Sequence, residues 1–183
     1  MNELTYDETA MFEDTEKFNK TLSKSNKVEI FFGALGMITF LFLAYIFKDK
    51  PIFLPIGFML IALASLFIAL YIIRNRKIKG EIPPKEDKLK YFKYWIYWYE
   101  NTDKLGRNVF WWYILPIVPG FLTLTVGMVQ LVPEKALLIL LVLGSTALIV
   151  GGVTIWLNRF YSSKKLQIRI VKLREYTTVL ELN

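Results

Sequence analysis

Four long apolar runs constrain what this chain can fold into more than any other feature of its sequence. They are Val28 to Phe47, Pro51 to Ile73, Asn108 to Val132 and Ala136 to Leu157. A helix needs about 20 residues to cross the hydrocarbon core of a bilayer, and each run is long enough. Their only charged residue is Glu29, one position inside the first run. The sequence therefore predicts an all-α membrane protein with four transmembrane helices.

Short polar breaks separate the runs within each pair. They are Lys48-Asp49-Lys50 and Pro133-Glu134-Lys135. Connections this short join antiparallel neighbours, so we expect two helical hairpins. The predicted organisation is an acidic N-terminal segment (1–27), a first hairpin (28–73), a basic aromatic linker and helix (74–107), a second hairpin (108–157) and an amphipathic C-terminal tail (158–183).

The positive charges gather on one predicted side of the membrane. The N-terminal segment carries four Lys and Arg residues, the central segment ten and the tail six, against two and one in the short breaks. Basic loops are retained in the cytoplasm. We therefore expect a multi-pass protein of the bacterial inner membrane with both termini and the central segment in the cytoplasm, where anionic lipids are partners of the basic residues.

Two segments outside the runs carry helical apolar stripes. Gly80 and Pro83-Pro84 interrupt the chain after the second run, and a new helix is expected from Lys85. Spacings of three and four residues are typical of an amphipathic helix. The residues expected to pack cytoplasmic helices together, within one chain or between copies, are Leu89, Phe92, Ile96 and Tyr99 before the third run, and Leu166, Ile170, Leu173 and Leu180 after the fourth. The alternation around Ile168 leaves a strand open as an alternative for 164–182.

Aromatic and basic residues are concentrated just before the third run. Tyr and Trp favour the headgroup region, because an apolar ring and a polar OH or NH are both satisfied there. The residues predicted to form a membrane-interface belt are Trp95, Trp98, Trp111, Trp112 and Tyr113 with Lys88, Lys90 and Lys93. A platform for stacked nucleic-acid bases would use the same residue types. The belt explains them already, so no nucleic-acid partner is expected.

The third run contains two prolines, Pro116 and Pro119, followed by Gly120. Proline lacks a backbone donor, so these residues predict a kink that Thr123 or a neighbouring helix satisfies. A broken helix lining a transport pathway is the alternative. No ionisable residue lies at mid-membrane depth to serve such a pathway.

The sequence leaves little for catalysis. It contains no Cys and no His, which removes thiol nucleophiles, imidazole bases and the common transition-metal ligands. We expect no metal and no cofactor. The acidic start reads as a solvated flank in which Asp14 or Thr15 caps a short helix. A lipid-modifying enzyme would have to use loop carboxylates such as Glu100 and Asp103.

The residues from Asn108 to Gly120 carry a resemblance. They resemble a Trp-x-Trp-Tyr-x-x-Pro-x-x-Pro-Gly segment of uncharacterised small bacterial inner-membrane proteins, in which a charged helix leads into the segment. Agreement falls at Trp112, Tyr113, Pro116, Pro119 and Gly120, while Phe110 stands where those proteins tend to have Trp. Some of them are encoded near extracytoplasmic-function sigma factors, so the resemblance implies a regulatory setting. It supplies no catalytic residue.

Together these features favour a non-enzymatic membrane scaffold or regulatory subunit. Its cytoplasmic helices would bind a protein partner or a second copy of the chain. An oligomeric pore or small transporter, shaped by Pro116 to Gly120, is the alternative hypothesis.

Overall fold

The computed structural model describes residues 7–76 and 81–182, and every regular element in these ranges is helical. In chain order the elements are α1 (Glu8–Ile46), α2 (Phe53–Arg76), α3 (Lys88–Arg107), the π-helical turn η1 (Phe110–Ile114), the 3₁₀ turn η2 (Leu115–Ile117), α4 (Val118–Leu131), the 3₁₀ turn η3 (Pro133–Lys135), α5 (Ala136–Tyr161), the π-helical turn η4 (Ser162–Leu166) and α6 (Gln167–Leu182). The all-α prediction is confirmed. The strand alternative for 164–182 is wrong, because η4 and α6 cover that segment.

Four helical segments in the described ranges are long and apolar enough to cross a membrane, as predicted. They are Glu8–Ile46, Phe53–Asn75, Phe110–Leu131 and Pro133–Leu182. Large apolar side chains cover their outer surfaces, among them Phe31, Phe32 and Leu148. Apolar surface of this extent is rare on soluble monomers and is expected where a protein faces lipid.

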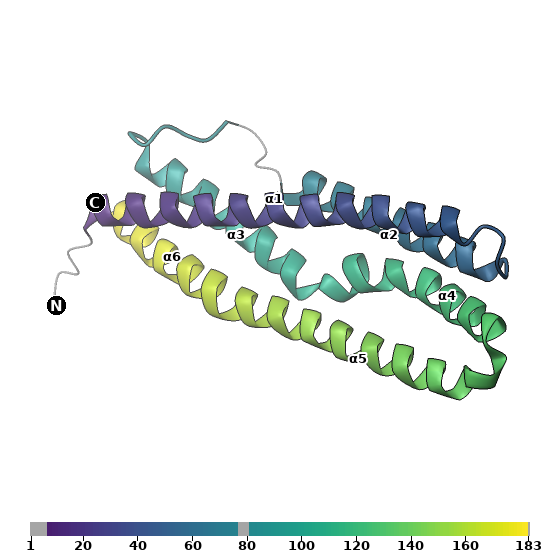
Figure 1. Ribbon diagram of the computed structural model, residues 1–183. Helices are drawn as coiled ribbons and strands as arrows, with labels where there is room; N and C mark the ends of the chain where they lie inside the picture. Colours follow the sequence, from purple (N-terminus) through teal and green to yellow (C-terminus); the bar gives the residue numbers. More distant parts are fainter. Residues whose placement is uncertain (1–6, 77–80, 183) are drawn as a thin grey trace.

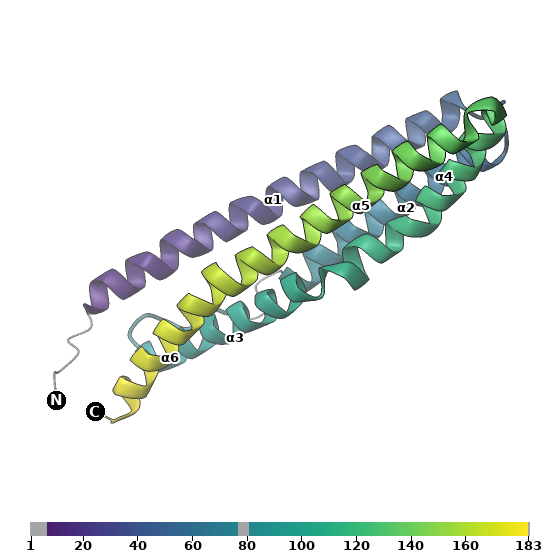
Figure 2. The ribbon, with the colours of Figure 1, turned by 90° about the horizontal axis from the view of Figure 1, so that it is seen from below.

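The helices form an elongated bundle (Figure 1). α1 and α2 lie side by side, α4 packs on the other side of α2, and α5 contacts α4 and α3. The connections at 47–52 and 132–135 lie at one end of the bundle, whereas the start of α1, α3 and the end of α6 lie at the other (Figures 1 and 2). The apolar segments therefore occupy one end of the molecule and the more polar helices the opposite end.

Helix α1 is one continuous helix of 39 residues, although the sequence suggested a boundary after residue 27. It begins earlier than predicted. The N-cap is Asp7, whose carboxylate accepts a hydrogen bond from the amide of Ala10 at 3.2 Å. The acidic Glu8 in the first turn interacts favourably with the positive end of the helix dipole. Asp14 and Thr15, expected as caps, lie inside the helix. The acidic flank and the first apolar run therefore form a single rod.

Close contact between α2 and α4 depends on glycine. A Cβ atom built on Gly127 would lie 2.6 Å from the backbone nitrogen of Leu54, and one on Gly57 would lie 2.5 Å from that of Leu124. Gly120 meets the α2 backbone in the same way. Small residues let helix backbones approach closely, which is how packing is gained between helices in lipid. The two helix backbones therefore approach closely along the apolar end.

The chain leaves α-helical geometry between α3 and α4, around the predicted kink. Five residues from Phe110 form a π-helical turn and the next three a 3₁₀ turn, before α4 begins at Val118. Pro116 and Pro119 cannot donate hydrogen bonds. The amide of Val118 donates to the carbonyl of Leu115, and the Thr123 hydroxyl donates to the carbonyl of Pro119 at 2.8 Å. The change in geometry is thus stabilised by local hydrogen bonds.

Replacing Gly127 with alanine should separate α2 from α4. We expect Gly127→Ala to lower the free energy of unfolding by about 1–3 kcal/mol, because the added methyl overlaps the α2 backbone. Thermal unfolding of the detergent-solubilised protein measures this. Gly152→Ala is the matched control, since no atom lies within 4 Å of a Cβ at that position. Equal melting temperatures for the two variants would contradict the close contact.

Candidate functional site: a three-helix unit and a lateral groove

The first part of α1 (8–24), α3 and α6 with η4 enclose one apolar core, which we call the three-helix unit. The stripes predicted for α3 and α6 meet inside a single chain. Leu180 lies half-buried against the core, and Leu89 is half-buried near the start of α3. The buried side chains of this core are Met11, Phe18, Leu22, Tyr91, Phe92, Trp95, Ile96, Trp98, Tyr99, Leu166, Ile170, Leu173 and Tyr176. Both stripes are therefore used internally.

Helix α1 supplies a third stripe that the sequence analysis missed. Met11, Thr15, Phe18 and Leu22 recur at spacings of four, three and four, and all are buried. The Phe18 ring meets the ring of Tyr99 edge-on, with centroids 5.4 Å apart and planes at 82°. This spacing was visible in the sequence. The surrounding carboxylates made the segment read as a solvated flank instead.

Ion pairs between helices surround this core. The guanidinium of Arg169 contacts both carboxylate oxygens of Asp14, at 2.5 and 3.1 Å, and lies 4.0 Å above the Phe18 ring. Exposed ion pairs add little stability, but bidentate and stacked arginine contacts are specific in geometry. The other pairs between separate segments are Lys88 with Glu8, Lys93 with Glu181, Arg174 with Glu100 and Lys85 with Glu16. These contacts define which faces of the helices meet.

The pKa values within the unit follow from these contacts. The hydrogen bond from Lys88 to Glu8 raises the pKa of the Lys88 ammonium, because the carboxylate favours the charged form of the lysine. Burial raises the pKa of Tyr176, which stays neutral. The unit thus combines a neutral aromatic interior with a charged rim.

The structure corrects the predicted membrane-interface belt. Trp95 and Trp98 are buried in the protein core, and their indole N–H groups find no acceptor in the part of the chain that the structure describes. The three lysines of the belt pair with carboxylates: Lys88 with Glu8, Lys90 with Asp87 and Lys93 with Glu181. Of the five aromatic residues predicted for the belt, Trp111 is the one left well exposed, at 66%. A Trp or Tyr ring is stable both in a protein core and in the headgroup region of a membrane. Residue type alone therefore could not show that Trp95 and Trp98 belong to the core.

Asp103 joins two helices within the three-helix unit, and Trp112 connects the unit to the apolar helices. The buried carboxylate of Asp103 accepts a hydrogen bond from the Gln167 amide at 2.6 Å, which joins α3 to the start of α6. The indole of Trp112 donates to the carbonyl of Leu105 at 2.9 Å and stacks on Tyr71 of α2, with centroids 5.2 Å apart. Trp112 is therefore a buried joint between α3, η1 and α2, and the half-buried Tyr113 packs beside it.

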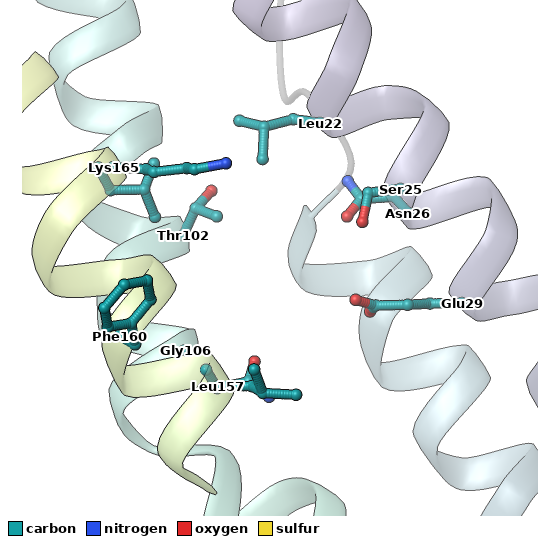
Figure 3. Close-up of a pocket in the computed structure, with 11 residues that line it drawn as sticks. Leu22, Ser25, Asn26, Glu29, Thr102, Gly106, Leu157, Phe160 and Lys165 are labelled. Carbon is teal, nitrogen blue, oxygen red and sulfur yellow. The ribbon is translucent and has the colours of Figure 1, made fainter. Parts of the chain in front are cut away.

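A groove runs between α1 and α5 below the unit, and we call it the lateral groove. Its outer part, of about 310 Å³, is formed by α1 on one side and by α3, α5 and η4 on the other. Figure 3 shows the Glu29 carboxylate and the Lys165 ammonium extending into this space. The other polar residues lining it are Ser25, Asn26, Thr102 and Asn158.

The inner part of the lateral groove, of about 520 Å³, continues between the apolar helices. Glu29 and Asn158 line both parts, so the two hollows lie next to each other. Beyond these residues the walls are mainly apolar. They include Phe32 and Phe40 of α1, Ile61 and Ile68 of α2, and Trp112 and Ile117 of the segment before α4. Apolar surface lines most of both parts, and more of the polar side chains lie in the outer part.

Comparison with known proteins gives no relative from which a function could be inferred. No family model, curated protein or solved structure matches the chain. The resemblance of residues 108–120 to a bacterial inner-membrane segment stays a prediction. Function must be argued from the three-helix unit and the lateral groove themselves.

Truncating Phe92 tests the core of the three-helix unit. Phe92 is fully buried, so we expect Phe92→Ala to destabilise the unit by about 3–5 kcal/mol through the cavity it leaves. Limited proteolysis within α3 and α6 measures the loosening. Tyr97→Ala is the control on the same helix, because Tyr97 is 66% exposed. Equal cleavage rates for the two variants would show that Phe92 does not support the unit.

Proposed function

We propose that this chain is a non-enzymatic integral membrane protein of the bacterial inner membrane, a scaffold or regulatory subunit whose three-helix unit lies in the cytoplasm and binds a protein partner or a second copy of the chain. The two hairpins, α1 with α2 and α4 with α5, serve as its membrane anchor. α3 and α6 are the amphipathic cytoplasmic helices.

An exposed apolar stripe on α6 carries this proposal. Ile168, Val171, Val179 and Leu182 are exposed, and their spacing of 3, 11 and 14 residues from the first places them on one face. The buried side chains Ile170, Leu173 and Tyr176 occupy the opposite face. Glu175 lies on the same face between them, so the stripe consists of two apolar patches, Ile168 with Val171 and Val179 with Leu182. Exposed apolar patches that the fold of the chain leaves uncovered are candidate interaction sites.

The position of α6 separates this stripe from lipid. α5, η4 and α6 follow one another as helix, so α6 extends away from the apolar end of the bundle (Figure 1). Leu182 follows Ile168 by 14 residues, about 21 Å along the helix axis. A bilayer that holds α5 does not reach that far. Protein, not lipid, is the partner that fits the distal part of the stripe.

Basic and aromatic residues at the junction support anionic lipid as a further partner. Arg159 and Lys164 lie where α5 leaves the apolar end, and Lys164 sits 4.8 Å above the Phe160 ring. Trp156 is exposed about one turn before Arg159. Exposed Trp beside basic residues is typical of the headgroup region at a cytoplasmic membrane face.

The competing hypotheses receive less support. The loop carboxylates considered for lipid chemistry are engaged in the unit, Glu100 with Arg174 and Asp103 with Gln167. In the proline segment considered for a transport pathway, Gly120 packs on α2 and Pro119 is exposed on the outside of the bundle. A binding function agrees with these positions, because it requires neither a catalytic carboxylate nor a transport pathway.

Single-cysteine labelling tests the proposed orientation, and the chain contains no native Cys. We expect Asp49→Cys and Glu134→Cys, in the two short connections, to react with a membrane-impermeant maleimide added to intact spheroplasts. Tyr97→Cys on α3 should react only after the membrane is opened. The reverse pattern would show that the three-helix unit faces outward.

Photo-crosslinking from the α6 stripe tests partner binding in native membranes. A photoreactive amino acid at Val171 should give one main adduct, and its mass distinguishes a second copy of this chain from another protein. The same amino acid at Tyr97, on α3, is the control for an exposed site off the stripe. The double variant Ile168→Lys, Val171→Lys should remove an adduct formed from Val179. Equal crosslinking from Val171 and Tyr97, or none from the stripe, would refute the proposal.

A further inference from the structure

A second hollow lies where the end of α3 meets α5, and we call it the arginine hollow. It has a volume of about 780 Å³. The residues that line it include Arg107, Asn108, Gly152, Ile155, Trp156 and Arg159. Thr154 and Asn158 of α5 line the lateral groove instead, so the two hollows lie on different faces of that helix.

The two arginines of this hollow are the charged residues that border the second pair of apolar helices. Residues 108–133 and 136–158 contain no charged side chain, so Arg107 precedes one uncharged stretch and Arg159 follows the other. Both guanidinium groups nevertheless line the same hollow. When the uncharged stretches occupy the hydrocarbon core, residues at their ends lie at the level of the lipid headgroups.

Arg159 differs from the other arginines of α3, α5 and α6. Those arginines pair with carboxylates: Arg107 with Asp103, Arg169 with Asp14 and Arg174 with Glu100. Arg159 is exposed, and within residues 7–76 and 81–182 its guanidinium has no carboxylate partner. The fold therefore leaves this charge available to an anion from outside the chain.

Arg107 is held in a fixed direction by a buried carboxylate. Its Nε lies 2.9 Å from Asp103, which also accepts the Gln167 amide at 2.6 Å. A guanidinium carries further N–H donors on its two terminal nitrogens, so a contact through Nε does not exhaust it. Asp103 offsets part of the charge of Arg107. Arg159 therefore supplies most of the net positive charge of the hollow.

The α5 wall of the hollow becomes apolar toward the membrane. Gly152, Ile155, Trp156 and Arg159 follow at helical spacings of three, four and seven residues from the first, so they share one face. Trp156 stacks on Phe160 with ring centroids 5.5 Å apart, and it precedes Arg159 by about 4.5 Å along the axis. A Cβ added at Gly152 would meet no atom within 4 Å. A cation, an indole and an uncovered backbone therefore follow one another into the bilayer.

We propose that the arginine hollow binds one anionic phospholipid, with its phosphate between Arg107 and Arg159, an ester carbonyl at the indole of Trp156 and an acyl chain along Gly152. This assignment gives a site to the anionic-lipid contact proposed above. It rests on the membrane position proposed there for α5, and it is independent of partner binding by α6.

Charge selects an anionic lipid over a zwitterionic one. Guanidinium groups bind phosphate oxygens through parallel N–H bonds. A choline or ethanolamine headgroup brings a cation of its own, and no carboxylate of the described residues lines the hollow to accept it. Basic pockets between membrane helices are typical sites for anionic headgroups. Phosphatidylglycerol carries a phosphate and no cation, so it is the probe that fits.

Binding of defined lipids by the purified chain tests this selection. The protein in detergent is titrated with dioleoyl phosphatidylglycerol or dioleoyl phosphatidylcholine, and bound molecules are counted by native mass spectrometry. We expect one phosphatidylglycerol to bind with an affinity roughly tenfold or more above that of phosphatidylcholine. Equal affinities for the two lipids would overturn the proposal.

A soluble headgroup distinguishes a lipid site from a phosphate site. Glycerol phosphate should compete with phosphatidylglycerol roughly a hundredfold less well than the lipid itself, because it has no acyl chain to bury. Competition at the same concentration as the lipid would show that the hollow binds phosphate alone, which contradicts the lipid assignment.

Arg159→Gln is the variant that decides the headgroup contact, because the fold does not use this side chain. It should weaken phosphatidylglycerol binding roughly tenfold and leave the melting temperature without added lipid unchanged. Arg74→Gln is the matched control, since Arg74 is an exposed arginine near the end of α2 and does not line the hollow. Equal weakening by both variants would refute a specific site.

A side chain at position 152 tests the path of the acyl chain. Gly152→Leu should weaken phosphatidylglycerol binding roughly tenfold without lowering the melting temperature, because the new side chain enters open space. Gly144→Leu is the control at another open glycine of α5 that does not line the hollow. Full binding by Gly152→Leu would rule out this path.

The membrane position is measured separately by the cysteine labelling described above. If Asp49→Cys labels as expected and the parent chain binds no phosphatidylglycerol, the arginine hollow fails as a lipid site and the proposed orientation stands.

Discussion

Backbone hydrogen bonding within the helices is the interaction on which the rest of this structure depends. In hydrocarbon each unpaired backbone group costs several kcal/mol, so every apolar run must be helical throughout. A helix can continue beyond the last apolar residue, because extending an existing helix costs less free energy than nucleating a new one. α1 therefore extends from the apolar end into the three-helix unit, and α5 continues through η4 into α6. The unit is made of the ends of these helices plus α3.

The sequence predicted those features that depend on composition or on one helix alone. Long apolar runs with at most one charged residue identify the apolar helices whatever their packing, and the spacing of Phe92 and Ile96 identifies α3. Several features that depend on the distance between helices were not predicted. A tryptophan such as Trp95 is found both in protein cores and in the headgroup region, so its residue type does not tell the two apart. The contact of Gly57 with Leu124 and the opening between α1 and α5 follow from packing that no local pattern encodes.

Charge distribution explains why the acidic beginning of the chain folds back on its basic centre and tail. Glu8, Asp14 and Glu16 of α1 pair with Lys88, Arg169 and Lys85 from segments at least 69 positions away. Each exposed pair contributes little to stability. Together they favour one arrangement of three helices around an aromatic core over the alternatives, since a different rotation of α1 would place like charges together. Electrostatics here selects the arrangement, and burial of Phe18, Phe92 and Tyr99 stabilises it.

The length of α1 has a mechanical consequence. A helix of 39 residues is a rod of about 58 Å, and roughly half of it projects beyond the apolar end. Transmembrane helices adjust their tilt to the thickness of the bilayer. A change of tilt of about 10° at the inner half would carry the tip near Met11 sideways by about 5 Å, on the axial rise of a helix. Such a displacement exceeds what a packed core tolerates without rearranging. A change in the tilt of α1 would therefore be transmitted to the packing of the three-helix unit.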